Sequence, residues 1–225
     1  MRNKGFKVIQ NVPVSSLREQ FGQIDIYLFD QILRGRIISG MRILDAGCGD
    51  GRNLVYLLRT ASSERYEIFG TDADPSAIAA VRRLAASLAP AIPAANFRVE
   101  TIEDMSFPDA FADVVLSSAV LHFATSDDHF QAMLQGMWRV LKPGGLFFCR
   151  LASSIGIEHQ IKRIEGRQFL LPDGSERYLV DEVLLAAMTK QLVAQPADPL
   201  KTTVVQNQRS MTTWVLRKSG MPKTS

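Results

Sequence analysis

The feature of this sequence that most constrains its fold is a repeated alternation of short apolar runs with segments of helical periodicity. The runs have the length of buried strands. Between them, apolar residues recur every three or four positions, which is typical of one face of a helix. Strands that alternate with helices over short connections form a parallel sheet with helices on both faces. We therefore predict an α/β fold whose strands cover Arg42–Ala46, Tyr66–Thr71, Asn96–Glu100, Phe111–Ser117 and Leu146–Cys149.

Local signals locate two helix starts and the end of the sheet. Asp74 followed by Pro75 predicts a helix with a capping acid and a proline at its first position. Ser126, followed by two acids, predicts another helix start. Two β-rich runs near the C-terminus, residues 201–206 and 211–217, are close enough in the chain to form an antiparallel hairpin.

Composition indicates the broad class of the chain. Its 225 residues include 26 Lys and Arg against 23 Asp and Glu, and the net charge of +3 is too small to demand nucleic acid as a partner. The two cysteines exclude a disulfide framework, and no run approaches the roughly 20 apolar residues of a membrane helix. We therefore expect a cytoplasmic protein without a secretory signal or membrane segment.

The chain is predicted to form one main domain with additions. Residues 1–40 are expected to form an N-terminal helical cap segment, 41–218 the main domain, and 219–225 a loose tail. Residues 152–180 interrupt the strand–helix rhythm and carry a turn signal at Pro172-Asp173-Gly174. Because long connections without a helix often serve as lids, we predict that this segment forms a two-stranded flap.

The most informative stretch is a glycine-rich turn, residues 43–53, that follows the first strand and opens a helix. Gly47, Gly49 and Gly51 let the backbone approach a ligand, and the helix N-terminus offers unpaired N–H groups. Their spacing does not match the dinucleotide-binding fingerprint. A glycine turn alone is equally consistent with a tight connection. Asp72 at the end of the second strand has two oxygens for two ribose hydroxyls, and it favours an adenosine-type ligand.

Four segments in order along the chain resemble the motifs of class I S-adenosylmethionine-dependent methyltransferases: residues 43–51, 70–75, 111–118 and 139–145. This resemblance implies a single-domain, Rossmann-like methyltransferase fold with a seven-stranded, mostly parallel sheet and an antiparallel last strand. It also implies S-adenosyl-L-methionine as the cofactor. A less specific similarity to tellurite-resistance-type and other small-molecule methyltransferases rests on residues 49–57, 117–123 and 213–218.

The resemblance further implies which residues bind the cofactor. The family often has an acid and then a small residue after the third strand, whereas this chain has Thr101 and Ile102 there. Glu103 is either the replacement for that acid at the adenine amino group or a solvated loop residue. The implied cofactor-binding residues are Asp45, Gly47, Cys48, Gly49, Gly51, Asp72, Ala73, Ile102, Glu103 and Ser118.

Methyl transfer from a sulfonium is an in-line displacement that depends on alignment, and it needs a base only when the acceptor must lose a proton. His122, just past the fourth strand, is the candidate catalytic residue, either as a base or as a group that orients the acceptor. A histidine packed at the rim is the alternative. The predicted substrate contacts are Tyr27, His122 and Arg150. His122 and His129 lack Glu or Cys companions at metal-ligand spacing, so we predict no metal site.

The predicted function is methyl transfer to a small-molecule acceptor, which the flap and residues 20–36 are expected to cover. Two alternatives stay open: an RNA or protein methyltransferase on the same fold, and a non-catalytic S-adenosylmethionine-binding module. Nucleic acid is the less favoured partner. The reason is that Ser117-Ser118-Ala119-Val120 stands where many methyltransferases of nucleic-acid amines have Asn/Asp-Pro-Pro-aromatic. The attacking atom and the oligomeric state are left open.

Overall fold

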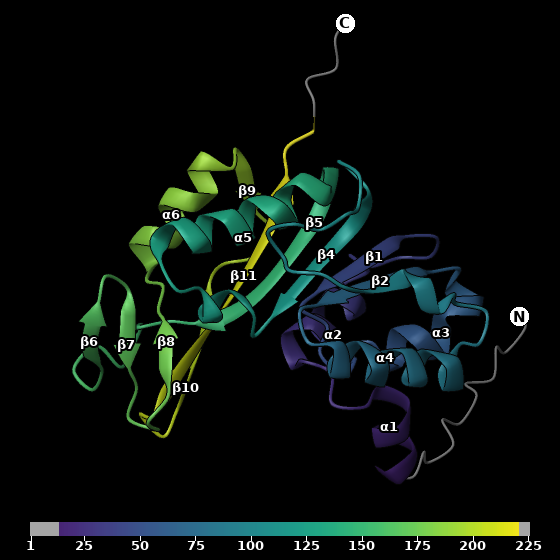
Figure 1. The fold of residues 1–225 in the computed structure, drawn as a ribbon, viewed down its shortest axis with the longest axis horizontal. Coiled ribbons are helices and arrows are strands. Elements are labelled where there is room, and N and C mark those ends of the chain that lie inside the picture. The colour runs from purple at the N-terminus through teal and green to yellow at the C-terminus, as the bar shows by residue number, and fades with distance from the viewer. Residues whose placement is uncertain (1–13, 221–225) are drawn as a thin grey trace, which may run out of the picture.

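A computed structural model describes the backbone of residues 14–220 and the side chains of residues 17–220. Its centre is a twisted sheet with the strand order β10-β11-β5-β4-β1-β2-β3, and a short further strand, β9, pairs with β11 (Figure 1). Neighbouring strands from β3 to β5 are parallel, whereas β11 is antiparallel to β5. The strands are β1 (Arg42–Ala46), β2 (Glu67–Asp72), β3 (Phe97–Val99), β4 (Ala112–Ser118), β5 (Leu141–Ala152), β9 (Ala194–Pro196), β10 (Lys201–Val205) and β11 (Arg209–Lys218).

The path of seven strands confirms the predicted sheet, including the reversal at the last strand. Residues 206–208 join β10 to β11 and are too few for a crossover between parallel strands, so these two strands are antiparallel. Since β10 is antiparallel to β11, it runs in the same direction as β5. β9 is an addition that the sequence does not signal, because none of its residues is buried.

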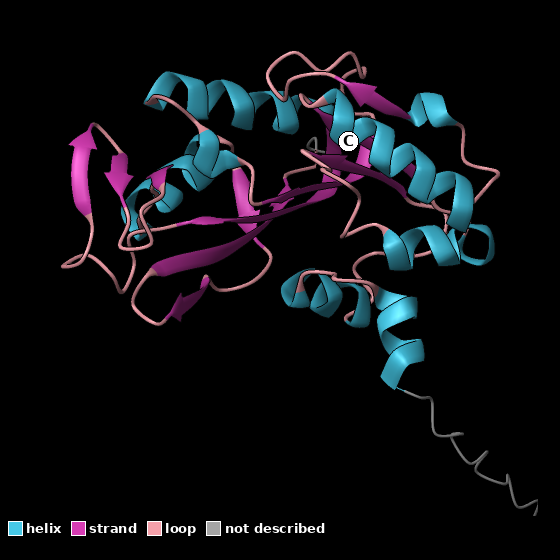
Figure 2. Cartoon of the chain, turned by 60° about the horizontal axis from the view of Figure 1, so that its bottom comes forward, coloured by secondary structure: helices cyan, strands magenta, loops and turns pink. Residues whose placement is uncertain are grey.

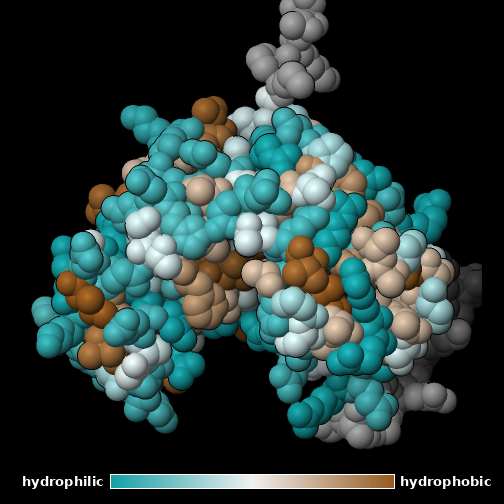
Figure 3. All heavy atoms as spheres, viewed as in Figure 1, coloured by the Kyte–Doolittle hydropathy of each residue, from teal (hydrophilic) through white to brown (hydrophobic). Residues whose placement is uncertain are grey.

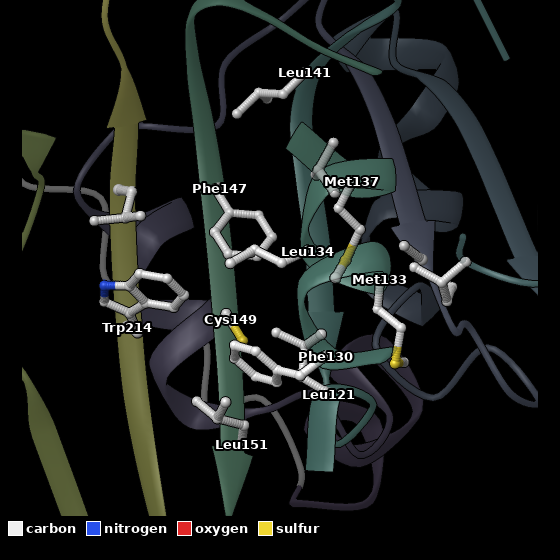
Figure 4. Packing of buried hydrophobic residues seen from close by; sticks show 14 of the residues in the cluster. Leu121, Phe130, Met133, Leu134, Met137, Leu141, Phe147, Cys149, Leu151 and Trp214 are labelled. Atoms are coloured by element: carbon white, nitrogen blue, oxygen red, sulfur yellow. The ribbon is translucent and has the colours of Figure 1, made fainter. Parts of the chain in front are cut away.

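Helices pack on both faces of the sheet, as predicted (Figures 1 and 2). Because side chains alternate along a strand, Phe147 and Cys149 of β5 belong to the core with α5 and α6, whereas Phe148 belongs to the core with α2, α3 and α4. Figure 4 shows the first of these cores, in which Leu134 of α5 lies beside Phe147 and Phe130 lies beside Cys149. The helices are α1 (Val14–Phe21), α2 (Ile26–Leu33), α3 (Val55–Glu64), α4 (Pro75–Leu88), α5 (Asp127–Val140) and α6 (Glu182–Gln191), with short 3₁₀ turns at Ala94–Asn96 and Leu121–Phe123.

Both predicted helix starts are present. The Asp74 carboxylate accepts a hydrogen bond from the Ser76 amide at 2.8 Å, and Pro75 occupies the first position of α4. At the start of α5, the Ser126 hydroxyl accepts from the His129 amide at 3.1 Å. These caps satisfy amides that have no partner within the helix. The loops that follow β2 and β4 are therefore each held at a defined helix start.

Within residues 152–180, a separate antiparallel sheet of three strands lies beyond the end of β5, so the flap has one strand more than predicted (Figure 1). Its strands are β6 (Lys162–Glu165), β7 (Gln168–Leu170) and β8 (Glu176–Tyr178). Every residue of β6 is exposed, so β6 lacks the apolar alternation that marks a half-buried strand. Tyr178 anchors the flap: its ring stacks on Phe130 of α5 at 4.9 Å, and its hydroxyl donates to Asp127 at 2.8 Å.

The predicted cap segment and tail are described only in part. Residues 1–13 of the cap segment and 221–225 of the tail lie outside the described residues. α1 and α2 lie within residues 14–40, and α2 buries Leu28 in the core that it shares with α3 and α4. Among residues 14–220, no helix combines the length and apolar content that a membrane crossing requires.

Candidate active site

A cavity of about 530 Å³ opens at the carboxyl edge of β1, β2 and β4, and we call it the first cavity. Its size is within the range of roughly 300–1,000 Å³ typical of small-molecule and cofactor sites. The carboxyl edge is also where open α/β sheets bind nucleotides. The lining residues are Gly47, Cys48, Gly49, Asp50, Arg52, Asn53, Asp72, Ala73, Thr101, Ile102, Glu103, Ser118, Ala119, Val120, Phe123, His129 and Met133.

The glycine-rich turn forms one wall of the first cavity. The amides of Gly47 and Cys48 both donate to the Thr71 carbonyl at 2.8 Å, which holds the turn against the end of β2. Gly47 has φ +83°, and an added Cβ would lie 2.4 Å from a methyl group of Val120. Gly49 also lines the cavity and has φ +53°. In contrast to Gly47, an added Cβ at Gly49 would meet no protein atom within 4 Å. The space beside Gly49 is therefore free for a ligand.

Asp72 lies at the end of β2 with its carboxylate held by two backbone amides. One oxygen accepts from the Gly49 amide at 2.9 Å, and the other accepts from the Asp74 amide at 2.9 Å. Each carboxylate oxygen has a second acceptor position. The side chain is thus oriented in advance, with capacity left for two hydroxyl donors from a ligand in the cavity.

Two of the predicted cofactor residues lie behind the turn and do not line the first cavity. Asp45 is 1% exposed, and neither of its carboxylate oxygens has a hydrogen-bond partner among the described residues. Burial raises the pKa of Asp45 to about 7, against the opposing charge of Arg52. Gly51 has a packing role, because an added Cβ would lie 2.8 Å from Val81 of α4. The other eight predicted cofactor residues line the cavity.

His129, a histidine without any motif context, also lines the first cavity. The ring nitrogen Nε2 of His129 is hydrogen-bonded to the Glu103 carboxylate, and Nδ1 accepts from the Thr125 amide at 3.1 Å. Because Nδ1 is an acceptor, the proton of the neutral ring is on Nε2 and is donated to Glu103. The pair joins residues 26 positions apart in the chain, which is why no local sequence pattern connects Glu103 with His129. Its one local signal is its position in the first turn of a capped helix.

A second cavity of about 510 Å³ adjoins the first, and Ala119 lines both. Figure 3 shows this edge of the molecule hollowed between the flap and the lobe formed by α1–α4. The walls come from the end of β5, the flap and the β10–β11 turn. The remaining lining residues are His122, Arg150, Ala152, Leu171, Asp173, Ser175, Arg177, Val205, Gln206, Gln208, Arg209 and Met211.

His122, the predicted catalytic residue, lines the second cavity but is 7% exposed. The Ala152 amide donates to its Nδ1 at 3.2 Å, so the proton of the neutral ring is on Nε2. Burial, together with the charge of Arg177, lowers the pKa of His122 to about 4. The ring is therefore neutral at physiological pH, and its free nitrogen is a hydrogen-bond donor. This geometry favours orientation of an acceptor over proton abstraction.

The other two predicted substrate residues are joined by Asp25, the cap of α2. Arg150 donates to the Asp25 carboxylate at 3.0 Å, the Tyr27 amide donates to the other oxygen at 2.9 Å, and the Asp25 amide donates to Asn53 at 3.0 Å. The N-terminal segment is thereby tied to both cavities. Arg150 lines the second cavity, whereas Tyr27 lines neither cavity and its hydroxyl is hydrogen-bonded to Thr203 at 2.8 Å.

Comparisons with known proteins agree with this geometry. Residues 43–145 match a family model described as a methyltransferase domain. An uncharacterized methyltransferase, sll0829, from Synechocystis sp. is 32% identical over 49% of this chain and 47% of its own length. A ubiquinone biosynthesis O-methyltransferase from Bradyrhizobium sp. is 29% identical over 71% of this chain and 64% of its own length. The chain thus spans about half of the first relative and less than two thirds of the second.

Among solved structures, a SAM-dependent methyltransferase from Methanosarcina mazei has a TM-score of 0.67 and 20% identity, with 84% of this chain and 97% of that chain covered. At this identity the likeness concerns the fold. Residues 43–145, slightly less than half of the chain, match the methyltransferase-domain model, and the four motifs that resemble class I S-adenosylmethionine-dependent methyltransferases lie within the same stretch. The cofactor of this class is S-adenosylmethionine.

The residues of the first cavity fit that cofactor. Gly49 leaves a cradle that a side chain would fill, and Asp72 is held with capacity for two hydroxyl donors, as a ribose requires. The apolar residues Ile102 and Met133 also line the cavity, and they suit a flat ring such as adenine. One adenosine-type ligand meets all of these features.

Proposed function

We propose that this chain transfers a methyl group from S-adenosylmethionine in the first cavity to a small-molecule acceptor in the second. The observation that carries the proposal is the shared wall: Ala119 lines both cavities, so ligands in the two chambers would meet at the carboxyl end of β4. A transfer that proceeds by in-line displacement requires this kind of adjacency.

In this proposal the first cavity binds and orients the cofactor. Asp72 accepts from the ribose hydroxyls, the backbone at Gly49 packs against the ligand, and Ile102 and Glu103 contact the adenine ring. When bound, S-adenosylmethionine supplies a methyl group activated by its sulfonium. The chain itself then has to align the acceptor and exclude water, which accounts for a site without a catalytic triad.

The second cavity orients the acceptor. His122 offers an Nε2–H donor at a fixed position, because its other nitrogen is held by the Ala152 amide. A neutral donor of this kind positions an acceptor oxygen or nitrogen without removing its proton. An acceptor that reacts without a protein base suits this chamber.

The flap covers the acceptor and determines which molecules enter. Its turn and β8 contribute Leu171, Asp173 and Arg177 to the second cavity, whereas no flap residue lines the first. Tyr178 fixes the flap to α5, so the flap forms a permanent wall of the second cavity. A chamber of about 510 Å³ suits a small molecule, and the relative from Bradyrhizobium, named for ubiquinone biosynthesis, supports that class of acceptor.

The test is a transfer assay with radiolabelled S-adenosylmethionine and a cell extract separated by size. We expect label in the small-molecule fraction, and we expect the Asp72→Ala variant to lose most of it. Label in RNA or protein would replace the small-molecule acceptor with a macromolecule. Binding of S-adenosylhomocysteine without transfer into any fraction would favour a non-catalytic binding module.

A further inference from the structure

The second cavity is lined by three arginines and a single acidic residue, and the arginines differ in how they are paired. Arg150 forms an ion pair with Asp25 at 3.0 Å, and Arg209 forms one with Asp173 at 3.2 Å. Arg177 has no carboxylate within 4.0 Å among the side chains of residues 17–220. The chamber thus holds more guanidinium groups than carboxylates to pair with them. Arg177 is the one without an ion pair in the described part of the chain, although its charge helps to lower the pKa of Asp173.

Arg177 lies at the junction of the two cavities. Its guanidinium is 5.0 Å from the centre of the Phe123 ring, and Phe123 lines the first cavity. The hydrogen bond that holds Arg177 goes from Nη1 to the Glu176 carbonyl at 2.6 Å, which leaves the other guanidinium donors without a partner among the described residues. His122 belongs to the same wall, and its Nε2–H is a second, neutral donor.

Part of the cavity lining is apolar. Leu171 from the flap and Val205 and Met211 from the terminal hairpin contribute it, and the hairpin also contributes the polar Gln206, Gln208 and Arg209. Leu171 is buried, but Val205 is 45% exposed, so the cavity is partly open to solvent on the hairpin side. The chamber therefore combines an apolar surface with a cationic end, and it is complementary to a molecule with an apolar body and one anionic group.

We propose that the methyl acceptor is a small organic carboxylate, held by a charge-assisted hydrogen bond from Arg177, with its apolar body against Val205 and Met211. This inference rests on the proposed function, because it names the class of acceptor for the same chamber. A planar guanidinium binds a carboxylate through two parallel hydrogen bonds. The guanidinium of Arg177, which forms no ion pair among the described side chains, and the neutral Nε2–H of His122 together match a ligand with one negatively charged carboxylate. The carboxylate would fix the orientation of the acceptor toward the first cavity.

The first test measures binding of matched pairs of ligands in the presence of S-adenosylhomocysteine. The probes are octanoate with octanamide and phenylacetate with phenylacetamide, titrated by saturation-transfer NMR. We expect at least one acid to bind at least tenfold more tightly than its amide. Arg177→Gln should weaken binding of that acid by roughly ten- to a hundredfold, the range for a hydrogen bond to a charged group, and leave the amide unchanged.

The control is Arg163→Gln. Arg163 is an exposed arginine of the same flap, lies over the Phe169 ring at 5.2 Å and does not line the second cavity. We expect this variant to bind the acid like the wild type, and both variants to keep the wild-type affinity for S-adenosylhomocysteine. If no acid is preferred over its amide, or if the preference survives in Arg177→Gln, the inference is wrong.

A second readout separates this inference from the proposed function. The small-molecule extract is divided by anion exchange before the labelling assay, and we expect the labelled acceptor in the retained, anionic fraction. Label confined to the unretained fraction would overturn the carboxylate acceptor and leave the proposed function standing. Acid-selective binding that depends on Arg177, without label in any fraction, would support the anion site and overturn the proposed transfer.

Discussion

The two cavities at the carboxyl edge of the sheet are built from different parts of the protein. About half of the lining of the first comes from the turns that directly follow β1 and β2, where backbone and short side chains face the cavity, and the rest comes from the segments after β3 and β4 and from α5. The second is formed by long side chains, among them Arg150, Arg177 and Arg209, from the end of β5, the flap and the terminal hairpin. Backbone contacts suit a ligand that is the same in every member of a class. Side chains on separate elements suit a ligand that differs between members.

The largest effect on cofactor affinity is expected from a substitution that disrupts only the first cavity. Gly49→Val would place a branched side chain in the space that the backbone leaves open, at φ +53° where only glycine is unstrained. We expect the affinity for S-adenosylhomocysteine to fall by at least roughly a hundredfold, or about 2.8 kcal/mol, measured by calorimetry. The matched control is Gly144→Val, at φ +78° with open space around it and outside both cavities. It should lose comparable stability and keep its affinity, and equal loss of affinity in both variants would contradict the account.

The next largest effect is expected when the oriented carboxylate of Asp72 is removed. Asp72→Ala should weaken S-adenosylhomocysteine binding by about 1.5–3 kcal/mol, the scale of a hydrogen bond to a charged group. Asp74→Ala is the control, because Asp74 caps α4 and does not line the cavity. The control should cost about 1 kcal/mol of stability without a change in affinity. Unchanged affinity in Asp72→Ala would remove Asp72 from the cofactor site.

A pH experiment distinguishes the two roles of His122. The folded-state pKa of about 4 lies below the ordinary value of 6.5, so the unfolded chain takes up a proton first as the pH falls. The wild type should therefore lose up to about 3 kcal/mol of stability between pH 6.5 and 4 through this residue, as seen in urea denaturation. His122→Asn, which keeps an acceptor for the Ala152 amide, should lack that loss.

The same variant tests catalysis. Because the neutral ring acts as a donor, we expect kcat of His122→Asn to fall by less than about tenfold, without loss of an ionisation between pH 5.5 and 8. A fall of roughly a hundredfold or more, together with the disappearance of a rate transition in that range, would instead identify His122 as the base.

The smallest effect concerns Asp45, behind the glycine turn. Its pKa is raised by burial to about 7, so the folded protein holds a proton that the unfolded chain has lost, and stability falls as the pH rises from about 4 to 7. Above pH 7 the ionised carboxylate should attract a cationic ligand. We expect S-adenosylmethionine affinity to rise a few-fold from pH 6 to 8 in the wild type, and less in Asp45→Asn. Equal slopes in calorimetry would exclude Asp45 from cofactor binding.

The sequence predicted the first cavity better than the second, for a physical reason. Gly47, Gly49 and Asp72 act through the turns on which they lie, and such turns are encoded within a few residues. Arg209 and Arg177 meet in one chamber only because the terminal hairpin and the flap fold back beside β5, and no local pattern signals that contact. β6 was missed for the related reason that an exposed strand needs no apolar alternation.

The central claim is that cofactor binding and acceptor choice belong to separate regions, and one measurement tests it most directly. Residues 160–177 are replaced by a short Gly-Ser linker, with Tyr178 kept because it stacks on Phe130 in the core. Affinity for S-adenosylhomocysteine and transfer to the acceptor found in the labelling assay are then measured on the same folded protein. We predict affinity within about tenfold of the wild type, near 1.4 kcal/mol, and loss of transfer by more than roughly a hundredfold. Abolished cofactor binding in a folded variant, or intact turnover, would contradict the account.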